Sequence, residues 1–213
     1  MEVYFHEEKK SKIKNYKRLN KFAPKGQVLF VGSSLMENFP VYELMLVRSS
    51  DKLIYNRGIG GYTTLEMLPS LETCIFDLEP SKIFMNIGTN DLNGEDYKVE
   101  TLIGNYEIII NKIRERLPKA KIYIMAYFPV NIEAARNPWM KEILGFRTNE
   151  RIVLANMELQ KLSSKTGAKF ININQNLLDE NGCLKKEYSI DGIHMYADGY
   201  EAIIDQLLIY VND

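Results

Sequence analysis

The sequence has few of the residues on which disulfide and metal sites depend. Its 213 residues include only 2 cysteines and 2 histidines. Cys74 and Cys183 stand alone, without the closely spaced Cys or His ligands that a structural zinc site needs. A chain of this length buries about 70% of the surface that its unfolded form exposes, so it can build a core without such bonds. We therefore expect two reduced cysteines and no structural metal.

Long apolar runs and an excess of charge of one sign are also absent. The chain has 27 Lys and Arg against 28 Asp and Glu, and so lacks the basic excess of a nucleic-acid binder. No run approaches the ~18 apolar residues of a membrane span. The first ten residues are charged where a secretory signal would be apolar. We expect a cytoplasmic protein with no nucleic-acid partner and no membrane span.

Two kinds of apolar pattern alternate along the chain. Short runs rich in Val and Ile favour buried parallel strands at residues 28–31, 53–55, 83–87, 122–126 and 170–173. Residues 99–117 and 197–211 have apolar side chains at steps of three and four, which is typical of amphipathic helices that cover a sheet. A lysine-rich segment at 7–22 predicts a solvated amino-terminal helix. We expect one α/β domain over residues 1–213, with a parallel sheet between helices and with residues 1–26 as a helical extension packed on it.

Small and polar residues gather where the predicted strands end. In such folds ligands sit beyond the carboxyl ends of the strands, so these segments are the candidate site. They read Gly32-Ser33-Ser34, Asn56-Arg57-Gly58-Ile59-Gly60-Gly61, Gly88-Thr89-Asn90-Asp91, Phe128-Pro129-Val130-Asn131 and, before the last helix, Asp191-Gly192-Ile193-His194.

Residues suited to nucleophilic catalysis occur among these segments. Asp191 lies three residues before His194, and one turn can bring its carboxylate to the ring Nδ1–H and leave Nε2 as a general base. Ser34 follows the first strand and precedes a predicted helix start. Each feature also has an ordinary interpretation, because Asp-x-x-His alone is a weak motif and serine is a common helix N-cap. His6, in a charged leader, is expected to be uninvolved.

Donors for an oxyanion are also present. Gly60 and Gly61 let the backbone approach a ligand closely, and Asn90 offers a side-chain amide. Together with the backbone N–H of Ser34 they would form a set of donors directed at one point. Rival motifs are missing: the chain has no phosphate-binding P-loop, no G-x-G-x-x-G and no G-x-S-x-G around Ser34.

These segments, in this order, resemble the SGNH hydrolase superfamily, also called GDSL lipases and esterases. Within it the chain is most similar to bacterial proteins that resemble the catalytic subunits of platelet-activating-factor acetylhydrolase, from about Val28 to the end. The resemblance implies a flavodoxin-like, three-layer α/β/α sandwich around a five-stranded parallel sheet. It implies that Ser34 is the nucleophile, His194 its base and Asp191 the orienting acid. The implied oxyanion hole consists of the Ser34 and Gly61 backbone N–H groups and the Asn90 side chain, with no metal or other cofactor.

The chain departs from the family pattern at two positions beside these residues. Ser33 stands where the family usually has aspartate, which puts the bonds that hold the first segment in doubt. Tyr62 stands where many relatives have a small or acidic residue, and it could narrow an acyl pocket. The less regular stretch 131–147, with Trp139, is either a loop or short helix that leans over the site and contacts substrate, or a plain surface connection.

We therefore expect a serine esterase that hydrolyses a small or medium acyl ester, such as a carbohydrate O-acetyl group or a lyso-lipid. Two alternatives stay open. An acyl thioesterase would use the same residues, and a non-catalytic binding module would keep the fold alone. The resemblance also implies a homodimer as one option for the assembly.

Overall fold

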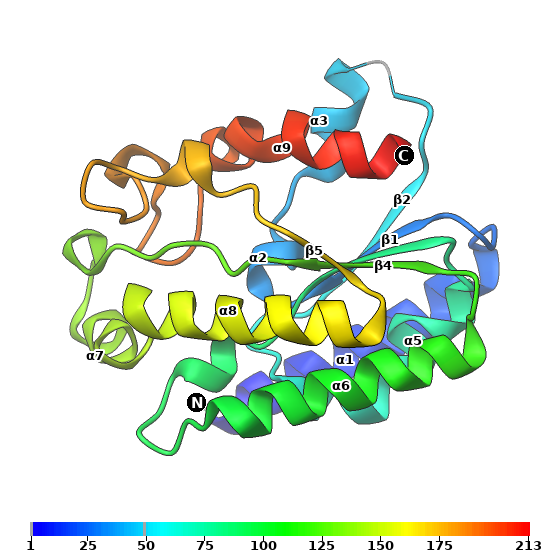
Figure 1. Cartoon of the computed structure of the whole chain (residues 1–213), viewed down its shortest axis with the longest axis horizontal. Coiled ribbons are helices and arrows are strands. Elements are labelled where there is room, and N and C mark those ends of the chain that lie inside the picture. Colours follow the sequence, from blue (N-terminus) through cyan, green and yellow to red (C-terminus); the bar gives the residue numbers. More distant parts are fainter. Residues whose placement is uncertain (1, 49) are drawn as a thin grey trace.

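The computed structural model describes residues 2–48 and 50–213, and it arranges them around one parallel sheet (Figure 1). The strand order is β2-β1-β3-β4-β5, which is the flavodoxin-like order. The strands are β1 (Val28–Gly32), β2 (Ile54–Gly58), β3 (Lys82–Asn86), β4 (Lys121–Met125) and β5 (Lys169–Ile171). The expected five-stranded parallel sheet is confirmed.

Helices cover both faces of this sheet. The α-helices are α1 (Glu2–Leu19), α2 (Ser34–Glu37), α3 (Val41–Val47), α4 (Thr64–Met67), α5 (Leu71–Cys74), α6 (Val99–Arg116), α7 (Pro138–Phe146), α8 (Asn149–Thr166) and α9 (Ala197–Asn212). Short 3-10 turns occur at Asn20–Phe22, Leu68–Ser70, Phe76–Leu78, Thr89–Leu92, Ile132–Ala134, Gln175–Leu177 and Lys186–Tyr188.

Alternate residues of each strand enter two separate cores, because side chains of a strand point to opposite faces. In β1, Leu29 and Val31 belong to the core shared with α1, α5, α6 and α8. Val28 and Phe30 belong to the core shared with α2, α3 and α9. Figure 1 shows these two helical layers below and above the sheet. The three-layer α/β/α sandwich is confirmed.

The strand that precedes the glycine-rich segment is longer than the sequence pattern predicts. Asn56, Arg57 and Gly58 were expected to follow this strand, but they are part of β2. The reason is pairing: residues 54–58 lie in register with residues 28–32 of β1, so the ladder continues as far as β1 does. Asn56 is accommodated because its side chain bonds to the Met36 carbonyl and to the Gly58 N–H.

Two other expectations change at their boundaries. The amino-terminal helix begins at Glu2 and ends at Leu19, and a 3-10 turn continues to Phe22, so the expected helix at 7–22 is displaced toward the amino terminus. The stretch 131–147 contains a 3-10 turn and the short helix α7. Asn137 begins α7 by accepting a hydrogen bond from the Met140 N–H, with Pro138 in the first turn.

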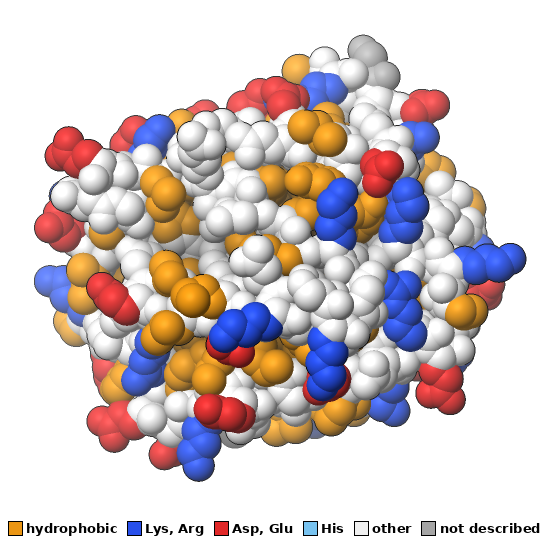
Figure 2. All heavy atoms as spheres, in the orientation of Figure 1, with side chains coloured by type: hydrophobic (Ala, Val, Ile, Leu, Met, Phe, Trp, Pro, Cys, Tyr) orange, Lys and Arg blue, Asp and Glu red, His pale blue; other side chains and the backbone are white. Residues whose placement is uncertain are grey.

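The surface carries charges of both signs. On the face of Figure 2, Lys and Arg side chains lie among Asp and Glu side chains and among exposed hydrophobic ones. Within residues 2–48 and 50–213, none of the helices has the length and apolar character needed to cross a membrane.

Close contact between β1 and β3 at Gly32 gives a test of the fold. A Cβ at Gly32 would lie 2.1 Å from the Asn86 carbonyl oxygen, whereas one at Gly104 in α6 would meet nothing within 4 Å. We expect Gly32→Ala to lower the free energy of unfolding by about 1–3 kcal/mol or more, measured by urea denaturation. The matched control, Gly104→Ala, should raise it by about 0.5–1 kcal/mol. Equal stability of the two variants would contradict this packing.

Candidate active site

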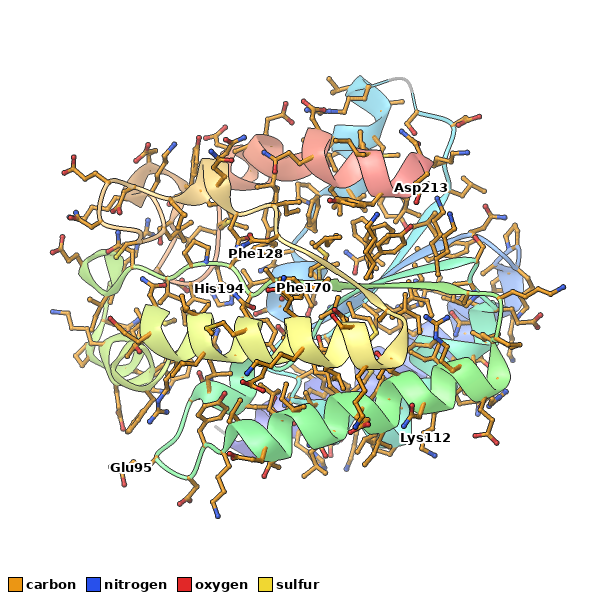
Figure 3. The ribbon with its side chains drawn as sticks, in the orientation of Figure 1. Glu95, Lys112, Phe128, Phe170, His194 and Asp213 are labelled. Carbon is orange, nitrogen blue, oxygen red and sulfur yellow. The ribbon has the colours of Figure 1, made fainter. Side chains whose placement is uncertain are left out.

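Ser34, His194 and Asp191 form a connected set of side chains, although Ser34 is far from the other two in sequence. Ser34 opens α2 directly after β1, and His194 lies just before α9, on the side of the sheet where the strands end (Figure 3). The Ser34 Oγ lies 2.8 Å from the His194 Nε2. The His194 Nδ1 lies 2.7 Å from the Asp191 Oδ2. The fold therefore brings a hydroxyl, an imidazole and a carboxylate into hydrogen-bond contact with one another, in that order.

The Asp191 carboxylate is held by its own short segment. Its Oδ1 accepts hydrogen bonds from the Ile193 N–H at 3.0 Å and the His194 N–H at 2.8 Å. Burial alone would raise the pKa of Asp191, but the hydrogen bonds from His194 and Ile193 outweigh it and lower the pKa to about 2. The charged carboxylate keeps the imidazole proton on Nδ1, so the Nε2 lone pair faces the Ser34 hydroxyl.

The expected oxyanion donors follow neighbouring strands. Ser34 follows β1, Gly61 follows β2 and Asn90 follows β3. Among the described residues, the backbone N–H groups of Ser34 and Gly61 donate to no backbone acceptor. The Asn90 Nδ2 donates to the Tyr62 carbonyl at 2.9 Å, which leaves its second hydrogen for a ligand. Gly61 is in the left-handed region, with φ of +68°, where a residue with a Cβ would be strained.

Side chains from three other elements hold the loop that carries Gly61. The Gly60 N–H donates to the Glu37 carboxylate of α2, and the Gly61 carbonyl accepts from the Lys9 Nζ of α1 at 2.8 Å. At the far end of the loop, the Asp91 carboxylate accepts from the Thr64 N–H at 3.0 Å and from the Thr64 hydroxyl. The loop is therefore anchored on both sides of Gly61.

Arg147 is a buried cation behind Asn90. It is 3% exposed, and its guanidinium donates to the Asn90 Oδ1 at 2.7 Å and to the Asn93 Oδ1 at 2.8 Å. Burial lowers the pKa of Arg147 to about 10, with the charge of Asp191 acting in the opposite direction, so the group is cationic at neutral pH. The sequence patterns did not indicate a role for Arg147 in the site. Arg147 lies at the end of the irregular stretch 131–147, and no local pattern marks it.

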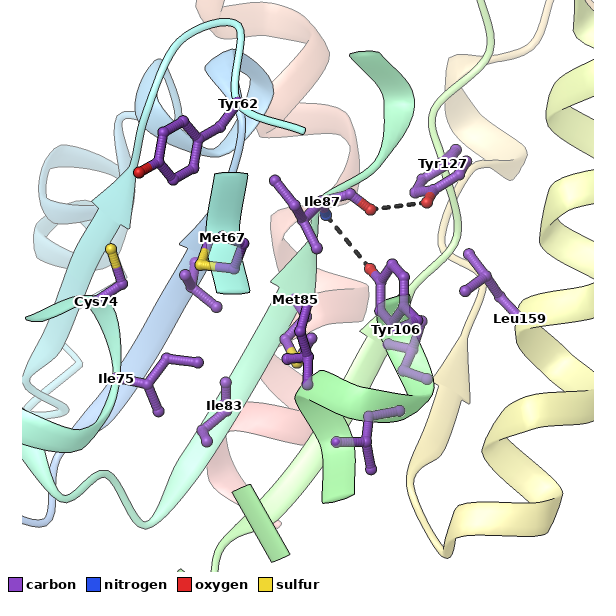
Figure 4. Close-up of a cluster of buried hydrophobic side chains, with 14 of the residues drawn as sticks. Tyr62, Met67, Cys74, Ile75, Ile83, Met85, Ile87, Tyr106, Tyr127 and Leu159 are labelled. Carbon is purple, nitrogen blue, oxygen red and sulfur yellow. Dashed lines mark hydrogen bonds between the residues drawn. The ribbon is translucent and has the colours of Figure 1, made fainter. Parts of the chain in front are cut away.

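Buried tyrosine hydroxyls hold the end of β3, from which the chain reaches Asn90 (Figure 4). The Ile87 N–H donates to the Tyr106 hydroxyl at 3.3 Å, and the Tyr127 hydroxyl donates to the Ile87 carbonyl at 2.7 Å. Both rings are fully buried. They satisfy the backbone groups of the first residue beyond the strand, so the turn into Asn90 starts from a fixed point.

Ser33 links the first segment to the third despite the missing aspartate. Its side chain is buried, with its Oγ 3.4 Å from the Thr89 Oγ1. Its backbone N–H donates to the Asn86 carbonyl at 3.2 Å. The bonds that hold this segment are therefore made by the backbone and by a pair of hydroxyls.

The two expected substrate contacts occupy different environments. The Tyr62 ring is buried near Met67 and Cys74 in the core drawn in Figure 4, and its hydroxyl lies 2.6 Å from the Ser70 Oγ. The backbone carbonyl of Tyr62 accepts the hydrogen bond from the Asn90 Nδ2. Trp139 lies on α7 and is 54% exposed.

The cysteines and the acidic residues form no further centre in the part of the chain that the structure describes. Cys74 and Cys183 are both free thiols. No group of three or more His, Cys, Asp or Glu side chains within residues 2–48 and 50–213 is arranged to hold a metal ion.

Comparisons with known proteins show which family and which solved structures the chain is similar to. The model of the GDSL-like lipase/acylhydrolase family matches residues 30–202. Platelet-activating factor acetylhydrolase IB subunit alpha2 of Rattus norvegicus is 27% identical over 181 residues, which cover 84% of this chain and 73% of that protein. A solved protein of Streptococcus pneumonia, whose name refers to platelet activating factor, is 32% identical with a TM-score of 0.87, over 99% of this chain and 95% of that one. An acetylxylan esterase of Geobacillus stearothermophilus shares the fold, with 14% identity and a TM-score of 0.66 over 89% of this chain and 95% of that one.

The lowered pKa of Asp191 predicts how stability changes in acid. A carboxylate whose pKa is lower in the folded state stabilises the fold above its unfolded pKa of about 3.9, and this contribution is lost as pH falls toward the folded pKa. We expect the wild-type chain to be more stable than Asp191→Asn at about pH 5, where the Asp191 carboxylate is fully ionised, and the gap to narrow below about pH 4. Urea denaturation of both proteins across this range measures the gap. A gap that stays constant down to about pH 2.5 would contradict the assigned hydrogen bonds.

Proposed function

The chain belongs to the GDSL-like lipase/acylhydrolase family, whose members hydrolyse esters, and on that premise we propose that it is a serine esterase that forms an acyl-enzyme on Ser34. The observation that carries the proposal is the 2.8 Å contact between the Ser34 Oγ and the His194 Nε2. A hydroxyl is a weak nucleophile unless a base takes its proton as it attacks, and this contact supplies the base.

In the first step the Ser34 Oγ attacks the ester carbonyl while the His194 Nε2 takes its proton. The imidazolium that forms is stabilised by the Asp191 carboxylate, 2.7 Å from the Nδ1, which remains ionised at neutral pH because its pKa is about 2. His194 then gives the proton from its Nε2 to the leaving alcohol. The products of this half-reaction are the free alcohol and an ester on Ser34.

The carbonyl oxygen gains negative charge in the tetrahedral intermediate, and the donors around Ser34 stabilise it. The backbone N–H groups of Ser34 and Gly61 and the second hydrogen of the Asn90 Nδ2 serve this role. The Arg147 guanidinium, bonded to the Asn90 Oδ1, draws electron density from the amide and makes the Asn90 N–H a stronger donor. Arg147 is thus a positioning and polarising residue that does not itself touch substrate.

In the second step a water molecule takes the place of the alcohol. His194 accepts a proton from this water as its oxygen attacks the acyl carbon, the same donors hold the oxyanion, and the carboxylic acid leaves as Ser34 recovers its proton. Both half-reactions therefore use the same residues and need no further group.

The open position of the site favours a short acyl group. Gly61 is exposed, and Ser34, Asn90 and His194 are each half-buried. A long acyl chain would bury little apolar surface at such a site, so we propose a small or medium acyl ester as the substrate.

Removal of the Ser34 hydroxyl tests the mechanism. We expect Ser34→Ala to lose turnover of p-nitrophenyl acetate and labelling by a serine-directed organophosphonate. The fold should persist, because Ser34 is the first residue of α2 and even loss of an N-cap side chain, one position earlier, costs only about 0.5–2 kcal/mol; a thermal melt measures this. Ser50→Ala, a serine outside the site, is the matched control and should label like wild type. A Ser34→Ala protein that still labels would contradict the assignment, and faster turnover of acetyl-CoA than of the ester would favour a thioesterase.

A double-mutant cycle tests the link between Arg147 and Asn90. We expect Asn90→Ala to lower kcat by on the order of 10²–10³, because one oxyanion donor is lost. Arg147→Met should also lower kcat in the wild-type background, and its effect should be much smaller when Asn90 is already alanine, because the two residues act through one contact. Additive effects of the two changes on kcat would show that Arg147 acts on stability or on another group.

A further inference from the structure

One face of α1 binds the loop that carries Gly61. Lys9, Lys12 and Tyr16 are spaced by three and four residues, which places their side chains on the same side of the helix. Each of these side chains reaches the stretch from Gly58 to Gly61, either directly or through one carboxylate. This spacing matches a helix that lies along the loop.

The contacts follow the loop in order. The Tyr16 hydroxyl donates to the Gly58 carbonyl at 2.6 Å, where β2 ends. Lys12 forms an ion pair with Glu37, whose carboxylate accepts the Gly60 N–H. Lys9 donates to the Gly61 carbonyl at 2.8 Å. The backbone is thus bound from α1 at its start, its middle and its end.

Lys9 connects the loop to the helix that follows it. Its Nζ lies 2.8 and 2.9 Å from the two carboxylate oxygens of Glu66. Glu66 in turn accepts the Thr63 N–H at 2.9 Å and completes the N-terminal capping box of α4. One ammonium group therefore joins Gly61 to the start of α4. The Lys9 side chain is only 18% exposed, so packing limits the directions in which its ammonium can point.

We propose that α1 is a positioning element of the oxyanion hole and that Lys9 is the residue through which it acts, an inference that rests on the proposed esterase function. The Gly61 peptide needs an external support because the segment Ile59-Gly60-Gly61 contains two glycines, whose backbone loses more freedom on ordering than that of any other residue. A donor acts on a developing oxyanion to full effect only when its direction is set before the reaction. The Gly61 N–H belongs to the peptide between Gly60 and Gly61, and this peptide is held on both sides, because Glu37 binds the Gly60 N–H and Lys9 binds the Gly61 carbonyl.

This role lies outside the part of the chain that the family model matches. That match begins at residue 30, whereas Lys9, Lys12 and Tyr16 all precede it. The donors themselves belong to the shared pattern, but the support of one of them comes from the amino-terminal extension.

The test compares two lysines of α1 in the full-length protein. Lys9→Met removes the ammonium and keeps most of the aliphatic stem. Lys10→Met is the matched control, because Lys10 faces solvent and, among the described side chains, pairs with Glu7 at 3.1 Å. With p-nitrophenyl acetate, we expect Lys9→Met to lower kcat roughly tenfold, less than the order of 10²–10³ expected when a donor is removed outright. Its KM should change little, and Lys10→Met should match wild type.

A conservative replacement should rescue the activity. Lys9→Arg keeps a donor to the Gly61 carbonyl and to Glu66, so we expect its kcat to be close to that of wild type.

A spectroscopic measurement separates positioning from a general loss of structure. In wild-type protein labelled with ¹⁵N-glycine, the Gly61 amide proton should move downfield when Ser34 is phosphonylated, because the phosphonyl oxygen occupies the oxyanion position. The shift should be smaller in Lys9→Met and in the more polar Lys9→Gln, while thermal melts of both variants stay cooperative.

Each contrary result has a distinct meaning. Equal kcat in Lys9→Met and Lys10→Met would overturn the role of Lys9 while the wild-type enzyme remains active. A downfield shift of the Gly61 amide proton on phosphonylation that is as large in Lys9→Met as in wild type would overturn it too. A loss of rate that Lys9→Arg does not restore would also overturn it. A wild-type protein that neither turns over esters nor labels at Ser34 would overturn the proposed function, and this inference with it.

Discussion

The in-register pairing of β2, β1 and β3 is the constraint on which the rest of the site depends. Gly32 of β1 pairs with Gly58 of β2 on one side and with Asn86 of β3 on the other. These are the last residues of the three strands, so the strands end side by side at the same edge of the sheet. The segments that leave these ends carry Ser34, Gly61 and Asn90. A shift of one residue in either pairing would move a donor by the rise of one strand residue, about 3.3 Å, which is more than a hydrogen bond tolerates.

Beyond the strand ends, side chains in place of neighbouring strands form the hydrogen bonds that hold the backbone. The loops around Ser34 have little regular structure, and their backbone groups are bound instead by Glu37, Asp91, the Lys9 ammonium and the hydroxyls of Tyr106 and Tyr127. A buried polar group without a partner costs about 1–3 kcal/mol, so the backbone at Thr64 and Ile87, both buried, resists leaving its conformation. Rigid loops are what a set of convergent donors requires.

Two cationic side chains bind different residues of the proposed oxyanion hole. Arg147 binds the Asn90 Oδ1 from the end of α7, and Lys9 binds the Gly61 carbonyl from α1. Both side chains thus place positive charge next to residues of the proposed oxyanion hole, where charge on a neighbouring group strengthens an amide donor.

By itself the sequence determined the features that arise from neighbouring residues. The strands follow from short apolar runs, and the bond between Asp191 and His194 follows from a spacing of three residues, because local geometry settles both. The end of β2 depended on its pairing with β1, and residues 56–58 were misplaced for that reason. Only the tertiary structure decided that the Ser34 Oγ lies 2.8 Å from the His194 Nε2, that Arg147 lies behind Asn90 and that Lys9 binds Gly61. These contacts join residues more than fifty positions apart, and no local pattern of charge or hydrophobicity encodes which distant partner a side chain meets.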